Sequence, residues 1–214
     1  MKKKNLQLAI SFILVACLIT GCAFFGFDAS AYVKACLDSN IHGEFDEYAK
    51  ITNSSVEDVE KLYNDFLDND LSFLNEYNVD DARRQEFREL FIKLYKNFKY
   101  DVGEATKTDD TYTVPVTYQK LIVFDEMAAN MEKDTTDYFQ AKVDAGENPS
   151  TDEIYEYVLN YMYDGVAKKL ENPQYEEPVT VNVTVSKMTA NAYGIDTNEL
   201  QELVQSMVDM DAVE

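Results

Sequence analysis

The chain has 214 residues, of which 46% are hydrophobic, and its 40 acidic against 19 basic side chains give a formal net charge of −21. Its 15 tyrosines and 12 phenylalanines supply ample material for a core, which excludes an intrinsically disordered chain despite the charge. The acidic balance also excludes nucleic-acid binding, because phosphates would be repelled rather than neutralised.

The first residues have the pattern of a secretory signal. Residues 2–4 are lysines, and Leu8 to Ile19 form an apolar run of twelve residues that only Ser11 interrupts. A helix that crosses a bilayer needs about 20 apolar residues, so this run is too short to be a membrane span. The pattern therefore predicts export rather than a transmembrane helix.

The four residues Ile19-Thr20-Gly21-Cys22 resemble the lipobox of bacterial lipoproteins. The resemblance covers only residues 1–22. It implies that residues 1–21 are a signal peptide that is cleaved off, and that the Cys22 thiol receives a diacylglycerol. It also implies a cell-membrane protein, lipid-anchored on the extracytoplasmic face. An ordinary secretory signal with a chance cysteine is the alternative.

Cleavage would make the chain more acidic, because the lysines at 2–4 are the only charged residues before Cys22 and the net charge would fall to −24. An anionic membrane surface repels such a chain, so the acyl chains, at about 0.8 kcal/mol per buried CH₂, would have to supply the attachment. We expect residues 22–27 to be a lipidated cysteine and short tether, and 28–214 to be a single acidic domain. A diverged duplication within that domain stays open.

Helical periodicity governs most of the mature chain. Asp28 or Ser30 is expected to cap the first helix and Gly43 to end it; Ser54 with Glu57 has the form of a capping box, as does Ser150 with Glu153. The helix that begins at Ser54 is expected to be followed by a separate helical turn that reaches about residue 77. The predicted helical ranges are 28–43, 45–50, 54–77, 80–98, 123–143, 150–162 and 196–208.

The period changes to two at Tyr112–Tyr118 and at Val179–Ser186, which predicts two half-buried strands. Residues 99–106 and 192–195 are expected to pair with them. Pro115 cannot donate to a ladder, so its strand is predicted to be an edge strand or a bulged one. The fold class predicted is α+β and helix-rich, with helices packed on one face of a small antiparallel sheet of three or four strands.

The block from Ala29 to Ile195 resembles domains of uncharacterised Gram-positive lipoproteins, similar in outline to cystatin-like or nuclear-transport-factor-like folds. The matching features are Tyr32-Val33-Lys34-Ala35, the alternating strand at 179–185 and Tyr193-Gly194-Ile195-Asp196. The tryptophan usual in such closing strands is absent here, and Tyr193 is expected to take its place.

Few groups that carry chemistry are present. His42 is the single histidine, which excludes a two-histidine zinc site, and no glycine-rich phosphate loop occurs. We predict no catalytic motif, no cofactor site and no metal site. Calcium at Asp68-Asn69-Asp70 or Asp109-Asp110 is the alternative to turn and helix-end acids. Cys36 lies on an apolar helical stripe, which predicts a small buried hydrophobe.

The tyrosines of 155–163 are candidates for ligand contact. Tyr157 and Tyr161 share a helical face with Ile154 and Val158, so core packing is expected to account for both. Tyr155 and Tyr163 fall elsewhere on that helix, and we predict them as the possible ligand contacts because tyrosine offers amphipathic contact area at low entropy cost.

These features predict a binding or interaction module rather than an enzyme. Its expected partners are a basic peptide, an envelope protein or a small ligand. The alternative is a carboxylate-dependent hydrolase of cell-wall sugar or peptide, which would need two carboxylates converging in a partly apolar cleft, one with a raised pKa. A spacer or assembly protein without a ligand is a third possibility.

Overall fold

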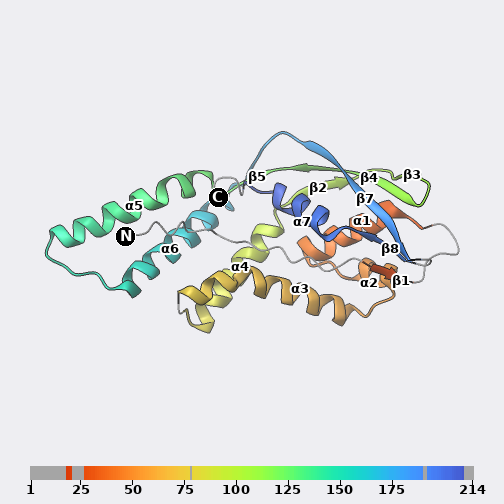
Figure 1. Cartoon of the computed structure of the whole chain (residues 1–214). Helices are drawn as coiled ribbons and strands as arrows, with labels where there is room; N and C mark the ends of the chain where they lie inside the picture. The colour runs from red at the N-terminus through yellow and green to blue at the C-terminus, as the bar shows by residue number, and fades with distance from the viewer. Residues whose placement is uncertain (1–17, 21–26, 78, 190–191, 210–214) are drawn as a thin grey trace.

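The computed structural model describes residues 18–20, 27–77, 79–189 and 192–209. The predicted signal peptide and Cys22 lie outside the described residues, apart from 18–20. The molecule is elongated, with the sheet at one end and a long helical hairpin at the other (Figure 1). Among the described residues, no helix is both long and apolar enough to span a membrane.

The main sheet is antiparallel, with the strand order β1-β8-β7-β4-β2, and β3 also pairs with β4. A separate two-stranded ladder joins β5 to β6. The strands are β1 (Leu18–Thr20), β2 (Lys99–Val102), β3 (Thr106–Thr108), β4 (Thr111–Gln119), β5 (Leu121–Ile122), β6 (Gln174–Tyr175), β7 (Val179–Thr189) and β8 (Ala192–Ile195).

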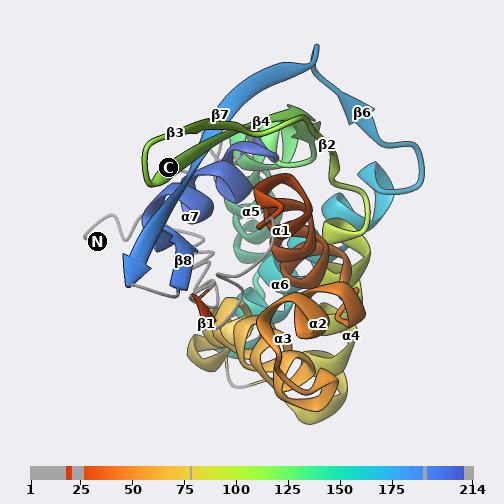
Figure 2. The ribbon, with the colours of Figure 1, turned by 90° about the vertical axis from the view of Figure 1, so that its right-hand side faces the viewer.

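The two faces of this sheet differ as the alternating sequence predicts. Val114, Val116 and Val185 are 0% exposed and lie on the face that packs on helices. On the opposite face the hydroxyls of Thr117 and Thr180 lie 2.8 Å apart in an exposed pair. The sheet arcs over the first and last helices (Figure 2). The predicted α+β class, with helices on one face of a small antiparallel sheet, is confirmed.

Pro115 lies in a central strand, so the edge-strand alternative is wrong. The irregular pairing expected of the bulged alternative is present on one side, where residues 103–105 face residues 114–115. β4 pairs with β7 on one side and with β2 and β3 on the other. The proline is tolerated because residues 103–105 interrupt the neighbouring strand opposite it, and the Gly103 amide donates to the Pro115 carbonyl at 2.8 Å. A Cβ at Gly103 would lie 2.8 Å from Pro115 Cγ, so this contact needs a glycine.

The helices begin and end largely where the sequence indicates. Their bounds are α1 (Ala29–Leu37), η1 (Asp38–His42, a π-helical turn), α2 (Asp46–Thr52), α3 (Val56–Asp70), η2 (Leu71–Glu76, a 3₁₀ helix), α4 (Asp81–Tyr95), α5 (Asp125–Asp144), α6 (Thr151–Lys169) and α7 (Thr197–Ser206).

Side-chain caps account for these starts. Asp28, Asp80 and Asp196 each accept a hydrogen bond from the first turn of their helix, and Ser150 forms the predicted capping box of α6. The prediction for α3 is wrong by one residue, since Ser55 rather than Ser54 accepts from the Asp58 amide.

Aromatic side chains are the largest residues of the core between the sheet and the helices. The largest fully buried side chains include Tyr32, Phe66, Phe87, Tyr95 and Phe124. Cys36 on α1 is 0% exposed, which confirms that it is a buried residue of this core.

One polar pair lies inside the helical core. Asp70, at the end of α3, is 0% exposed and accepts a hydrogen bond from the Tyr95 hydroxyl. Its Oδ1 atom has no hydrogen-bond partner among the described residues. Burial raises the pKa of the Asp70 carboxyl to about 7, and the hydrogen bond from Tyr95 offsets part of the rise. The native protein therefore holds this proton up to near-neutral pH.

Asp70 should make the protein less stable as pH rises. An unfolded aspartate releases its proton near 3.8 and the native one near 7, so the native state binds more protons between these values. The free energy of unfolding should then fall by about 2.5 kcal/mol from pH 5 to pH 8 through this group. Urea unfolding at each pH measures it, and Asp70→Asn should lack this component. An identical pH dependence in both proteins would contradict the assignment.

Candidate functional site

Helices α5 and α6 form an antiparallel hairpin that extends away from the sheet (Figure 1). Gly146, at φ 87°, ends the hairpin's first helix in a conformation that favours glycine, and the Ser150 capping box starts the second. Met127 is the buried hydrophobic residue of α5 among the described side chains, whereas α6 buries Leu159, Met162 and Val166. The hairpin is thus seated through α6, which also contacts α4.

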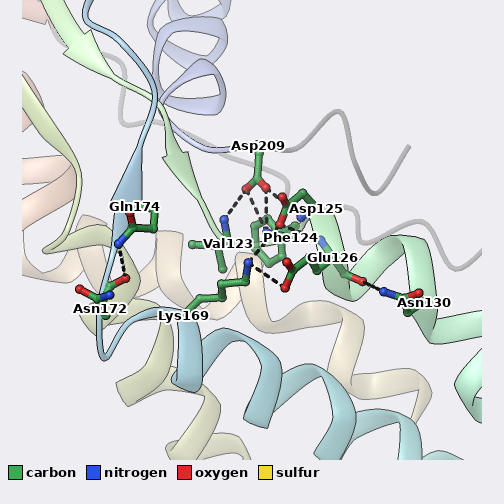
Figure 3. Close-up of polar contacts among 9 residues, drawn as sticks. All are labelled: Val123, Phe124, Asp125, Glu126, Asn130, Lys169, Asn172, Gln174 and Asp209. Carbon is green, nitrogen blue, oxygen red and sulfur yellow. Dashed lines mark hydrogen bonds and ion pairs between the residues drawn. The ribbon is translucent and has the colours of Figure 1, made fainter.

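The carboxylate of Asp209 holds the base of the hairpin. Its two oxygens accept hydrogen bonds from the backbone amides of Val123, Phe124 and Asp125, at 2.9–3.0 Å (Figure 3). These amides open α5, where a helix has unpaired N–H groups and favours negative charge. Lys169 at the end of α6 pairs with Asp125 at 3.4 Å and with Glu126 at 3.1 Å. Asp209, near the C-terminus, therefore holds the start of α5 in place through these hydrogen bonds, an arrangement we call the clamp.

Loss of this clamp should loosen the hairpin. In Asp209→Asn the charge and one acceptor oxygen are removed while the shape is kept, so we expect a loss of about 2 kcal/mol in the free energy of unfolding. The amides of residues 123–125 should exchange with solvent hydrogen faster in the variant than in the parent. Unchanged exchange at these three amides would show that the carboxylate is not what protects them.

A first groove, the Met127 groove, lies between α5 and α6 and has a volume of about 560 Å³. The helices approach closely here because Gly165 faces Met127; an added Cβ would lie 3.0 Å from Met127 Sδ. The lining residues are Val123, Glu126, Met127, Asn130, Tyr157, Asn160, Tyr161, Asp164, Gly165, Lys168, Lys169 and Asn172.

Tyr157 and Tyr161 both line this groove. The expectation of core packing is confirmed for Tyr161, which packs against the core, and is wrong for Tyr157. Both are half-buried, Tyr157 stacks on Tyr138 with ring centroids 4.4 Å apart, and the Tyr161 hydroxyl donates to Asp134 at 2.8 Å. The buried face of α6 is that of Leu159 and Met162, and Tyr161 lies at its border. Periodicity alone did not separate the two neighbouring faces of an amphipathic helix.

A second groove, the Tyr155 groove, lies between α6 and the segment that joins η2 to α4. Its volume is about 510 Å³. Two tyrosine rings, Tyr77 and Tyr155, meet edge to face at 5.2 Å and 74°. Tyr155 is 38% exposed. The lining residues are Tyr77, Val79, Asp80, Arg83, Asp152, Tyr155, Glu156, Leu159 and Asn160.

Arg83 is held as a fixed part of this groove's wall. Its guanidinium donates to Glu86 at 2.6 Å and to Asn160 at 2.7 Å, and it lies 4.9 Å from the ring centre of Tyr163. Tyr163 in turn packs edge-on against Phe87 at 5.5 Å. Of the two tyrosines predicted as ligand contacts, Tyr155 therefore lines a groove and Tyr163 lies behind Arg83.

Burial raises the pKa of the Tyr77 hydroxyl, and the neighbouring Glu76 and Tyr155 raise it further. The phenol therefore stays protonated at neutral pH and can donate a hydrogen bond at the groove. The carboxylates that line the groove come from three helix positions, Asp80 at the start of α4 and Asp152 and Glu156 on the first turns of α6.

The acidic clusters considered for calcium are arranged differently. Asp68 pairs with Arg88 at 2.5 Å, whereas Asp70 turns inward to Tyr95, so these carboxylates diverge. Asp109 and Asp110 form the turn before β4, and Asp110 pairs with Lys187 at 3.3 Å. No group of three or more potential metal ligands is present among the described residues.

His42 lies at the end of η1, where its ring stacks on Tyr100 with centroids 5.2 Å apart. Its Nε2 atom lies 3.2 Å from the Phe98 carbonyl oxygen. The Tyr100 hydroxyl donates to Asp38 at 2.6 Å, and burial followed by this bond raises the pKa of Tyr100. These contacts tie η1 to β2 and give the histidine a structural setting.

Comparison with known proteins gives one structural likeness. No family model matches the sequence, and no curated protein matches it. The fold is similar to the crystal structure of a "putative lipoprotein (ycdA) from Bacillus subtilis subsp. subtilis str. 168", with a TM-score of 0.58 and 17% identity over 85% of this chain. The chain spans 56% of that neighbour's length. At this identity the likeness shows a shared α+β fold, found in a protein described as a lipoprotein.

Proposed function

We propose that this protein is an extracytoplasmic lipoprotein, anchored in the cell membrane through Cys22, whose domain binds a partner rather than transforming it. The observation that carries the proposal is the Tyr155 groove: two tyrosine rings and three carboxylates line a hollow on the hairpin side of the molecule. Concave sites with aromatic walls and a few polar groups are typical of binding surfaces.

Three features are consistent with the anchor. The lipobox residues 19–22 follow a basic head and a short apolar run. The structural neighbour that shares the fold is described as a lipoprotein. A chain of net charge −24 after cleavage would be repelled by an anionic membrane surface, so a lipid would be needed to hold it there. Cleavage after Gly21 would also remove β1 and leave β8 at the sheet edge.

The contacts of Phe27 support an orientation on the membrane. Its ring stacks on Tyr193 of β8 at 4.6 Å and 6°, and meets Tyr112 of β4 edge-on at 5.3 Å. Five residues at up to about 3.6 Å each limit Cys22 to within about 18 Å of Phe27. The hairpin extends from the opposite end of the molecule (Figure 1). An anchored domain would therefore face the membrane with its sheet end, and its hairpin would point away from the membrane.

The rival function, a carboxylate-dependent hydrolase, has less support. It needs an acid of raised pKa in an open cleft, next to a second carboxylate. Among the described carboxylates, the one with a raised pKa is Asp70, which is fully buried and lines neither groove. The cystatin-like or nuclear-transport-factor-like resemblance stays a prediction.

The anchor is tested by metabolic labelling with palmitate in a bacterial host that processes lipoproteins. The parent protein should carry the label and fractionate with membranes. Cys22→Ala should lose the label and leave the membrane fraction, because the acylated sulfur atom is absent.

Cys36→Ala is the matched control, since it removes the buried thiol and should leave labelling unchanged. Membrane association of Cys22→Ala equal to that of the parent would refute the lipid anchor.

A further inference from the structure

We infer that the Tyr155 groove receives a lysine or arginine side chain from a basic peptide, held between the tyrosine rings and the carboxylates of Asp152 and Glu156. This inference rests on the proposed function, because it names the ligand class of the same groove. Its basis is the combination of ring geometry, charge and an apolar floor.

The rings form a corner suited to a cation. Tyr77 and Tyr155 meet at 74°, so the edge of one ring abuts the face of the other and the two planes enclose an angle. A cation attracts an aromatic face when it lies within about 6 Å of the ring centre. Tyr155 is 38% exposed, which leaves ring surface accessible from solvent.

The same chemistry already occurs in the wall of the groove. The Arg83 guanidinium lies 5.0 Å from the ring centre of Phe87 and 4.9 Å from that of Tyr163. Its hydrogen bonds to Glu86 and Asn160 satisfy that cation internally. Arg83 therefore shows that a cation can pack on aromatic rings at this groove. Its charge is neutralised by Glu86, which does not line the groove.

The remaining charge in the groove is negative. The Asp80 carboxylate accepts a hydrogen bond from the backbone amide of Arg83 and so caps α4. The side chains of Asp152 and Glu156 form no ion pair or hydrogen bond within the described part of the chain. Arg83 is the one cation among the lining residues, against the three carboxylates of Asp80, Asp152 and Glu156. This excess of negative charge would repel an anionic ligand, whereas a cationic ligand would neutralise it.

The floor of the groove suits the stem of such a side chain. Two apolar residues line the groove, Leu159, which is 4% exposed, and Val79, which is half-buried. Lysine and arginine bury their methylene stems along apolar surface while the charged head stays with polar groups. The net charge, −21 for the full chain and −24 after cleavage, adds a long-range attraction for basic peptides that is screened by salt.

The Met127 groove differs from the Tyr155 groove in the charge of its lining residues. It contains Lys168 and Lys169, of which Lys169 pairs with Asp125 and Glu126, so its charges are mixed. It therefore gives no comparable preference for a cation. The charge pattern, rather than the volume, separates the two grooves.

The test is calorimetric titration of the lipidated full protein, in neutral detergent micelles, with tetralysine and tetraarginine amides. The double variant Asp152→Asn with Glu156→Gln should raise the Kd by about tenfold. Tyr155→Ala should raise it by about fivefold, whereas Tyr155→Phe, which keeps the ring, should stay within about twofold. Tetraglutamate should not bind.

The matched control is the double variant Glu57→Gln with Glu60→Gln, which removes the same charge from exposed positions of α3. It should change the Kd by less than about twofold. An equal loss in both double variants would mean attraction to the overall charge only and would overturn the inference. Failure of the parent to bind either peptide would also overturn it, while palmitate labelling would still decide the proposed anchor. Circular dichroism of each variant confirms that it folds.

Discussion

The arrangement of the candidate site depends on how the α5–α6 hairpin is attached to the domain. The Asp209 carboxylate accepts hydrogen bonds from the three amides that open α5, and the carbonyl of Leu121 accepts from the Asp209 amide at 3.2 Å. A carboxylate at a helix N-terminus combines hydrogen bonding with a favourable interaction with the helix dipole. Because both grooves involve α6 and this helix packs on α5, the clamp at the base indirectly positions the ligand-facing side chains.

The two ends of the molecule have different chemistry. At the sheet end, Phe27 packs among Tyr32, Tyr112 and Tyr193 within reach of the proposed lipid anchor. At the hairpin end, acidic side chains outnumber basic ones, as they do over the whole chain. An anionic membrane would repel these acids, so electrostatics and the short tether favour the same orientation. The aromatic residues near the anchor support the proposed orientation, and the acidic residues of the hairpin support a cationic ligand.

The sequence predicts those features of the fold that depend on local pattern. The caps at Asp28, Asp80 and Asp196 and the alternation at 179–185 are local, and the structure has them. Ser54 and Ser55 both fit the helix start, because each has an acid three residues later, and only the chain geometry selects Ser55. The local pattern does not choose between an edge strand and a bulged one for Pro115, because its tolerance depends on an interruption in a neighbouring strand.

The candidate site is less predictable because its contacts are non-local. Tyr155 could be singled out as lying off the core face, but its partner Tyr77 is far away in sequence. Asp209 meets amides 84–86 residues away, and no local pattern indicates this. Tyr163 and Tyr155 look equivalent on a helix until the position of Arg83 distinguishes them.

The central claim, that the Tyr155 groove is where this protein meets its partner, is tested most directly by photo-crosslinking in cells. A photoreactive amino acid is placed at Tyr155 in the anchored protein, and at Leu62 of α3, which has a similar exposed fraction of 40% against 38% for Tyr155. The account predicts a discrete crosslinked species from position 155 that free tetralysine suppresses, and none from position 62. Equal crosslinking from both positions, or none from position 155, would contradict it.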